Sequence, residues 1–281
     1  MFVVIVSLGL GCAEQSSPNV ERAKQHMAML DYQAASLELK TALGSDRSLV
    51  EARWLLGQIY LELGDVRSAE KELLLAAEFG WVGDDTRPAL AKAYLSQGKF
   101  HQALQLNPEG LQPDAAARLL SIQALAELAQ GRTEAAARLV AAARKYRPDS
   151  GAAALAEARI YAYQWRTRAA LALVDAVLAD NAFNADAWRL RGQLLLQSEK
   201  LEDARNAYDR AIAYSNVAFS DRVSRALINY QLEEFGAVSA ESAILLQLSP
   251  QHPSAQYIHG LVLFREGNYR EASKAFTKAE P

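Results

Sequence analysis

The sequence has little cysteine, little histidine and almost no net charge. Its 281 residues contain one cysteine and four histidines, and its formal net charge is −3. One cysteine excludes an internal disulfide framework and a multi-cysteine metal site. A nearly balanced charge without a basic cluster argues against nucleic-acid binding. Because no run of about 20 apolar residues is present, we expect no membrane-spanning helix in the mature protein.

Motifs for catalysis and cofactor binding are lacking as well. The histidines are His26, His101, His252 and His259, and no two of them have the one-turn spacing of a helical metal site. Gly98-Lys99 lacks the rest of a phosphate-binding loop, and no G-x-S-x-G nucleophile motif occurs. We therefore expect no enzymatic activity, no metal or cofactor and no small-molecule substrate.

The sequence is instead rich in regularly spaced small residues. Residues 185–216 are typical of two amphipathic helices joined by a tight turn, with Gly192, Ala204 and Ala211 where two close-packed helices would cross. Steps of 34 residues from Gly192, with a single step of 33, land on alanine or glycine throughout the chain. These predicted packing positions are Ala23, Gly57, Ala91, Ala124, Ala158, Gly192, Ala226 and Gly260.

The spacing W-x3-G-x2-L-x8-A-x3-Y-x2-A after Trp188 resembles the tetratricopeptide repeat. This resemblance implies an all-α superhelical solenoid of about eight helix-turn-helix repeats. We expect the repeats to occupy residues 19–281, after a signal-like segment (1–12) and a polar linker (13–18). Glycines are expected in left-handed conformation at the ends of several first helices, namely Gly64, Gly98, Gly131 and Gly267.

Two repeats are irregular. The second helix of the third repeat begins at Phe100, and we expect it to stop near Leu106 because prolines follow at 108 and 113. The loop before this repeat carries Trp81, which either forms a hinge or partner notch or covers a helix end. The last repeat leaves Phe276 and Ala279 without a polar cap. We therefore expect further repeats, or a partner, to cover it.

The N-terminus has the features of an export signal. Residues 2–10 are apolar and are followed by Gly11-Cys12, which resembles the lipobox of bacterial lipoproteins. The segment departs from that pattern in having Gly9 where leucine is usual and in lacking a basic start. An uncleaved apolar tail with a chance cysteine is the alternative. The resemblance implies lipid anchoring through Cys12, and Ala13 resembles the sorting signal for the periplasmic face of the outer membrane.

In tetratricopeptide solenoids the first helix of each pair lines a concave groove, so the resemblance also implies which residues face a partner. The candidates are Trp54, Gln58, Leu61, Lys92, Leu95, Leu125, Leu128, Arg159, Arg189, Gln193, Leu227, Tyr230, Tyr257, Leu261 and Phe264. Such a groove suits an extended or helical protein segment with apolar anchors. The Lys/Asn cluster of the chaperone-binding members is absent. The alternative role for these residues is packing between repeats.

Three segments carry a closer resemblance, residues 51–80, 174–188 and 249–276. With the lipobox-like start, they resemble the PEP-CTERM system TPR-repeat lipoprotein family. This implies a bacterial envelope scaffold that binds protein partners in exosortase-type sorting and in exopolysaccharide production or export. The alternative is an assembly or pilot lipoprotein that helps to place an outer-membrane secretin or porin. The resemblance supplies no catalytic residue.

Overall fold

The computed structural model describes residues 17–29, 31–215 and 218–280. Within these residues the chain forms sixteen α-helices and no strands. In chain order they are α1 (Pro18–Ala28), α2 (Tyr32–Ser45), α3 (Val50–Glu62), α4 (Val66–Glu78), α5 (Thr86–Ser96), α6 (Phe100–Gln105), α7 (Pro113–Ala129), α8 (Thr133–Tyr146), α9 (Gly151–Tyr163), α10 (Thr167–Asp180), α11 (Ala185–Gln197), α12 (Leu201–Tyr214), α13 (Phe219–Gln231), α14 (Phe235–Leu248), α15 (Pro253–Arg265) and α16 (Tyr269–Ala279). None of these described helices is both long and apolar enough to cross a membrane.

Several helices begin at residues that either accept a hydrogen bond from a free N–H group of the first turn or have no such group themselves. The Asp31 side chain accepts the N–H of Ala34 at 3.0 Å, and Asn184 accepts that of Ala187 at 3.0 Å. Proline, which has no N–H to satisfy, stands at the start of α1, α7 and α15. These local signals fix where the helices of several repeats begin.

Helix ends depend on residues in left-handed conformation. Gly64, Gly98, Gly131 and Gly267 all have positive φ angles, between 71° and 81°. The same place after α9, α11 and α13 is held by residues other than glycine, namely Trp165, Glu199 and Glu233, at φ angles of 58° to 60°. A side chain in this conformation costs about 1–2 kcal/mol. Tertiary packing therefore imposes the left-handed turn in these three repeats. The spacing of glycines did not predict the turn there, because no glycine is present.

The eight predicted small positions lie inside the helix pairs. The five alanines among them are fully buried. A Cβ atom on Gly57 would lie 2.7 Å from Leu73 Cγ, and one on Gly192 would lie 2.8 Å from Tyr208 Cε2. Each glycine thus lets the backbone of a first helix approach a large side chain on the second helix of its pair.

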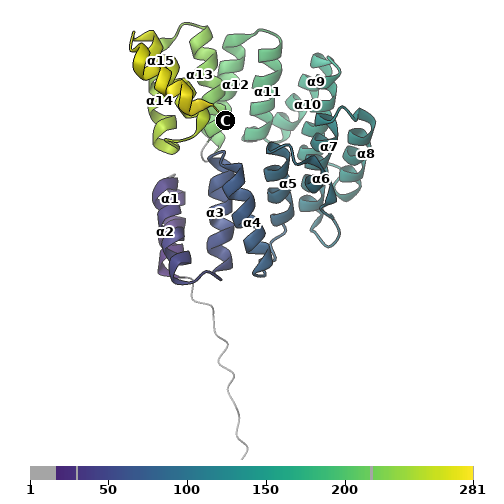
Figure 1. The fold of residues 1–281 in the computed structure, drawn as a ribbon. Coiled ribbons are helices and arrows are strands. Elements are labelled where there is room, and N and C mark those ends of the chain that lie inside the picture. The colour runs from purple at the N-terminus through teal and green to yellow at the C-terminus, as the bar shows by residue number, and fades with distance from the viewer. Residues whose placement is uncertain (1–16, 30, 216–217, 281) are drawn as a thin grey trace, which may run out of the picture.

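The first helices form an inner layer and the second helices an outer one. Backbone contacts join α3 to α5, α5 to α7, α7 to α9 and α9 to α11, whereas each of α8, α10 and α12 contacts the first helices on either side of it. Figure 1 shows the resulting path: α1–α5 form a lower row, α11–α15 an upper row, and α6–α10 join the two rows at one side. The inner layer lines the concave side of this superhelix.

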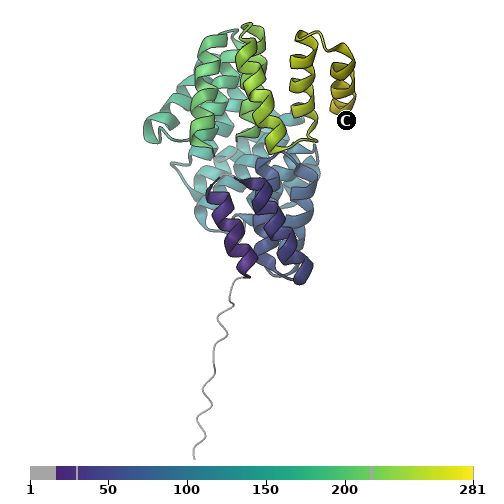
Figure 2. The same ribbon diagram turned by 90° about the vertical axis from the view of Figure 1, so that its left-hand side faces the viewer.

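The superhelix returns on itself, so that its first two repeats lie against its last two (Figure 2). One hydrophobic cluster contains Tyr32 and Leu63 from the start of the chain and Phe219 and Leu245 from its end. The Gln33 side-chain amide donates to the backbone carbonyl of residue 247. Such contact between distant repeats ties together parts that would be independent in an open solenoid.

His252 lies at the centre of this inter-turn contact, which we define by Gln33, Gly64, Phe219, Gln247 and His252. The rings of Phe219 and His252 have centroids 4.4 Å apart. A Cβ atom on Gly64 would lie only 3.1 Å from His252 Nε2, so the turn after α3 and the start of α15 are in close contact. A change in the charge of this imidazole therefore affects a contact between the two ends of the solenoid.

The inter-turn contact is expected to weaken at acidic pH. Burial lowers the pKa of His252 below its ordinary value of 6.5, and the Gly64 backbone and the charge of Asp65 offset this only in part. The Nδ1 atom of the neutral ring accepts the Ser254 N–H at 3.1 Å, a hydrogen bond that protonation abolishes. Because the unfolded chain takes up the proton first, this stability is complete above pH 6.5 and decreases as the pH falls toward the folded-state pKa.

A thermal unfolding series across this pH range tests the expectation. The melting temperature of the wild type should fall more steeply below pH 6.5 than that of His252→Asn, since asparagine also caps a helix but does not titrate. The other histidines are the same in both proteins, so their contributions cancel. Parallel curves would show that His252 does not couple pH to this contact.

The third repeat is shortened, and two polar side chains compensate for this. The Gln123 side chain on α7 donates to the carbonyl oxygens of Ala103 at 2.9 Å and Leu106 at 2.8 Å, at the end of α6. Arg87 Nη1 donates to the carbonyl oxygen of Glu109 at 2.7 Å. These bonds satisfy carbonyl groups that a longer helix would have paired internally.

Candidate protein-binding groove

The inner surface contains a pocket of about 640 Å³ between α5, α7, α9 and α11. Five of the predicted groove residues meet in its lining, namely Leu95, Leu125, Leu128, Arg159 and Gln193. The other lining residues are Ala129, Ala162, Tyr163, Leu190, Leu194 and Gln197. Four consecutive repeats therefore contribute first helices to one hollow on the concave side.

The repeat period explains why these side chains come together. Leu125, Arg159 and Gln193 are each 34 residues apart and lie on α7, α9 and α11. Residues one period apart have the same orientation in stacked repeats, so they form a row across the inner surface. Arg159 Nη1 donates to Gln193 Oε1 at 2.8 Å along this row. A segment that lies across α7, α9 and α11 would therefore contact Leu125, Arg159 and Gln193 in that order.

Arg189 was predicted as a groove residue, and the structure places it in an internal ion pair. Its Nε and Nη2 atoms donate to the two carboxylate oxygens of Asp221 at 2.7 and 2.8 Å, and its Nη1 donates to Asp186. Burial alone would lower the pKa of Arg189, but the hydrogen bonds and charge of Asp221 outweigh burial and raise it. The pair joins α11 to α13, which makes Arg189 a structural residue.

Trp54 is also less available than its position suggests. The ring of Trp81, from the loop between α4 and α5, stacks on that of Trp54 with centroids 5.6 Å apart and an interplanar angle of 20°. The indole N–H of Trp81 is buried and has no hydrogen-bond acceptor in the part of the chain that the structure describes. The loop thus covers one face of a predicted groove residue.

The remaining candidates near the start of the chain lie apart from the pocket. Leu61 packs against a cluster that contains Leu73 and Tyr94. Gln58 is half-buried, and Lys92 is exposed on α5. These residues are not brought together with one another in a common hollow.

The candidates near the end of the chain form two further groups. Tyr230 and Leu261 line a smaller hollow of about 180 Å³ with Phe235 and Arg265. Leu227 is exposed on α13.

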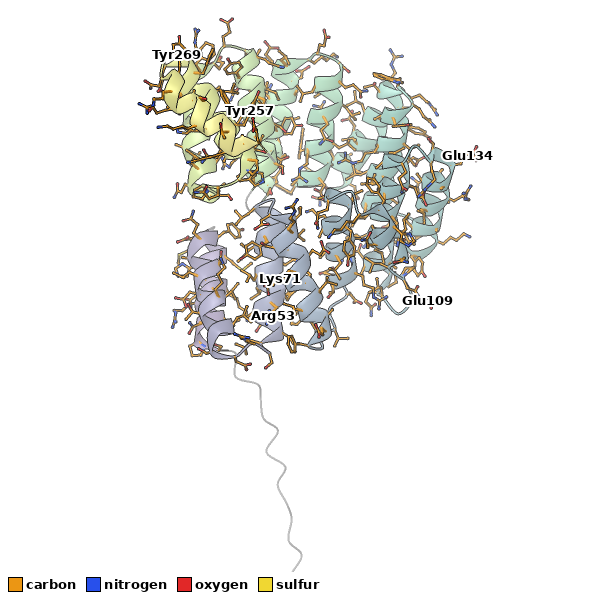
Figure 3. The ribbon with its side chains drawn as sticks, in the orientation of Figure 1. Arg53, Lys71, Glu109, Glu134, Tyr257 and Tyr269 are labelled. Carbon is orange, nitrogen blue, oxygen red and sulfur yellow. The ribbon has the colours of Figure 1, made fainter. Side chains whose placement is uncertain are left out.

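On the last repeat, Tyr257 and Phe264 are 45% and 53% exposed. Their rings lie 5.7 and 5.4 Å from those of Phe276 and Tyr269. Figure 3 shows Tyr257 and Tyr269 on this last repeat, distant from α5–α9. The predicted groove is therefore several separate surfaces, of which only the pocket unites residues from four repeats.

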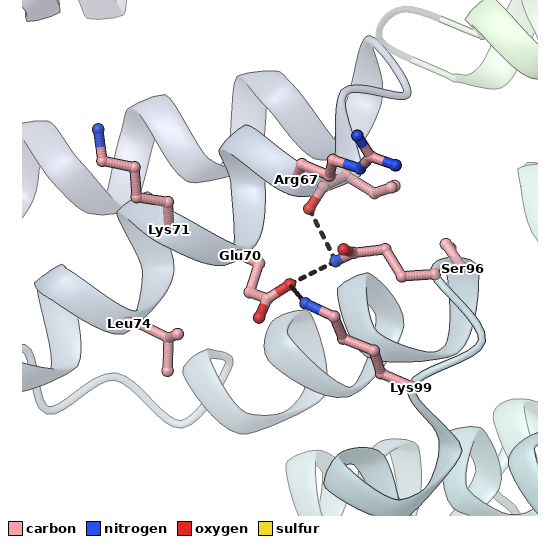
Figure 4. A pocket seen from close by; sticks show the side chains of 8 residues that line it. Arg67, Glu70, Lys71, Leu74, Ser96 and Lys99 are labelled. Carbon is pink, nitrogen blue, oxygen red and sulfur yellow. Dashed lines mark hydrogen bonds and ion pairs between the residues drawn. The ribbon is translucent and has the colours of Figure 1, made fainter. Parts of the chain in front are cut away.

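Another hollow, of about 760 Å³, lies between α4 and the end of α5 (Figure 4). Glu70 pairs there with Lys99 Nζ and accepts a hydrogen bond from the Gln97 side-chain amide at 2.6 Å. That amide also donates to the carbonyl oxygen of Val66 at 3.2 Å. Because its central polar groups already satisfy one another, we place the candidate site in the concave pocket although this hollow is larger.

The described residues contain no group of three histidine, cysteine, aspartate or glutamate side chains placed to hold a metal ion. Within the same residues, His101 is hydrogen-bonded to Gln105 at 2.9 Å, and His252 belongs to the inter-turn contact. The chemistry that the concave pocket offers is therefore apolar contact, amide hydrogen bonding and one guanidinium group.

Sequence reasoning missed several lining residues that the same period could have found. Ala129, Tyr163 and Gln197 are again 34 residues apart and follow the predicted row at a fixed offset. Leu190 and Leu194 belong to the hydrophobic core and border the pocket with their edges. Their part in the pocket depends on the curvature of the superhelix, which the spacing does not specify.

The fold described above agrees with the match to a family model. Residues 20–84 and 155–218 match the tetratricopeptide repeat family. The structure has the all-α solenoid fold of tetratricopeptide repeats, a fold that typically serves as a non-enzymatic scaffold for protein–protein interaction. A solved structure described as "Crystal structure of MamA" is similar to this chain with 21% identity and a TM-score of 0.45, and the match covers 54% of this chain and 90% of that one. No curated protein sequence matches the chain.

Proposed function

We propose that this protein is a non-enzymatic scaffold that binds a segment of a partner protein in the concave pocket between α5, α7, α9 and α11. The observation that carries the proposal is the convergence of four first helices on one open hollow, which is lined by leucine side chains and a few polar groups. Its volume of about 640 Å³ is large enough for several side chains of a bound segment. Apolar anchors with a few polar contacts are typical of segment recognition in helical grooves.

Site-specific photo-crosslinking tests this proposal. A photoreactive residue is placed at Leu125, in the pocket, or at Ala176, which is exposed on the outer helix α10. Crosslinks to a partner are expected from position 125 and not from position 176. Crosslinks from position 176 alone, or equal labelling from both, would contradict binding in the pocket.

We further propose that the protein is a lipoprotein on the periplasmic face of the outer membrane and serves exosortase-type sorting and exopolysaccharide production or export. The support is the sequence of the lipobox-like start and the three segments that resemble the PEP-CTERM system lipoproteins. Cys12 lies outside the described residues. Metabolic labelling with a fatty acid, followed by membrane fractionation, should show a lipid on the wild type and none on Cys12→Ser. An unlabelled wild type would refute the anchor.

A second candidate function is assembly of an outer-membrane secretin or porin through surfaces outside the groove. Large apolar side chains on turns between the helices favour it: Trp165 is 80% exposed and Phe183 is 70% exposed. In that case crosslinks should come from the outer face, and substitutions in the pocket should leave placement of the partner unchanged. The same pair of crosslinking positions thus separates the two functions.

A further inference from the structure

The pocket holds a single charged side chain, Arg159 on α9. One of its N–H groups donates to Gln193 Oε1 at 2.8 Å. Of the carboxylates among the described residues, none lies within ion-pair distance of it. A guanidinium has five N–H donors in a fixed fork, so most of the Arg159 donors have no acceptor in the part of the chain that the structure describes. None of its nitrogen atoms belongs to the buried, unsatisfied groups of the described chain, so these donors are accessible from the pocket.

Arg159 differs in this respect from two other arginines on first helices. Arg189 is held by Asp221 and Asp186, and Arg225 is paired with Asp209 and Glu241. Those two arginines have their charge neutralised within the solenoid. Among the described residues, Arg159 donates only to the neutral oxygen of Gln193, and Asp186 acts on its charge from beyond ion-pair distance.

The surroundings of Arg159 destabilise its charged form. Burial lowers the pKa of Arg159 below its usual value, the charge of Asp186 acts in the opposite direction, and the charge of Arg189 adds to the lowering. A partly desolvated cation without a counter-ion loses hydration that its protein contacts do not replace. A bound carboxylate would replace the lost hydration through short, charge-assisted hydrogen bonds.

We propose that the partner segment has two parts, an acidic residue that binds Arg159 and apolar residues on one side of it that contact Leu95, Leu125 and Leu128. The order follows from the lining, since Leu95, Leu125 and Leu128 come from α5 and α7 and the polar pair from α9 and α11. The two leucines that α11 adds, Leu190 and Leu194, are buried core residues, each 2% exposed. This inference rests on the proposed function of the pocket and specifies the chemistry of its ligand. The carboxylate belongs to a side chain or to a C-terminus, and the test separates these sources.

The test begins with selection of random linear peptides on the full chain. The strongest binder is then synthesised in its original form, with its acidic residue changed to the amide, and with an amidated C-terminus. Affinities are measured by fluorescence anisotropy for the wild type, Arg159→Gln and the control Arg138→Gln. Arg138 is exposed on the outer helix α8.

Removal of the essential carboxylate is expected to weaken binding to the wild type about ten- to a hundredfold, the usual range for a hydrogen bond to a charged group. Whichever change has this effect identifies the source of the carboxylate. Arg159→Gln should weaken the original peptide by a similar factor and should bind the amide form as well as the original, whereas Arg138→Gln should behave as the wild type.

Two failures have different meanings. In the first, the peptides bind and Leu125→Asp abolishes binding, but neither change of a carboxylate has an effect. The proposed acidic residue is then wrong, and the proposed function of the pocket stands. If no peptide is selected, or if Leu125→Asp leaves binding unchanged, the proposed function of the pocket fails together with this inference.

Discussion

Replacement of Arg189 by methionine is expected to lower the free energy of unfolding by about 3–5 kcal/mol, the cost of leaving a buried charge without its partner. The Asp221 side chain is only 1% exposed, and both of its carboxylate oxygens accept hydrogen bonds from Arg189. Methionine keeps most of the side-chain volume but donates no hydrogen bond. The measurement is urea unfolding followed by circular dichroism.

A double-mutant cycle shows that the loss comes from the unpaired carboxylate. Arg189→Met combined with Asp221→Leu should recover most of the lost stability, because a buried ion pair can be exchanged for apolar residues at little cost. Arg205→Met is the matched control, since Arg205 lies 3.8 Å from the exposed Glu234 and should contribute only about 0–1 kcal/mol. Additive losses in the double variant would contradict this account.

The substitution Gly192→Leu is expected to destabilise the protein by about 1–3 kcal/mol through overpacking. A Cβ atom there would already lie 2.8 Å from Tyr208 Cε2, and Tyr208 is fully buried between α11 and α12. The ring cannot move away without disturbing the contact with α13. A drop in melting temperature measures the effect.

Gly44→Leu is the matched control for this substitution. Gly44 lies in helix α2, and apart from its chain neighbours and the nearby backbone of that helix, no atom of the described residues lies within 4 Å of the place a Cβ atom would take. Loss of glycine from a helix stabilises it by roughly 0.5–1 kcal/mol, so this variant should be as stable as the wild type or slightly more so. Equal destabilisation by the two leucines would mean that Gly192 does not mark a close crossing.

The repeating part of this fold could be predicted because it depends on local rules. The recurrence of small residues at positions such as Gly57 and Gly192 specifies a helix pair in every period, and the structure has the all-α solenoid that this predicts. The inter-turn contact could not be predicted in this way. It depends on small rotations that add up over all repeats and bring His252 near Gly64, although 188 positions separate them in the sequence.

The sequence could predict the candidate site as a row of positions. It could not predict which charged side chains of that row are held in ion pairs. The period placed Leu125, Arg159 and Gln193 on one surface, and the structure brings them into one pocket. The same rule treated Arg159 and Arg189 alike, whereas Asp221 neutralises only Arg189. That difference arises because position 221 is an aspartate, whereas one period earlier the chain has Ala187. The pattern of small residues contains no information about such a single charged position.

Hydrogen exchange with and without the selected peptide tests the central claim, that the concave pocket is the binding surface. Exchange should slow in the parts of α5, α7, α9 and α11 that line the pocket and should stay unchanged in the outer helices α4, α8 and α10. Protection confined to the outer helices, or none in the four inner ones, would contradict the account.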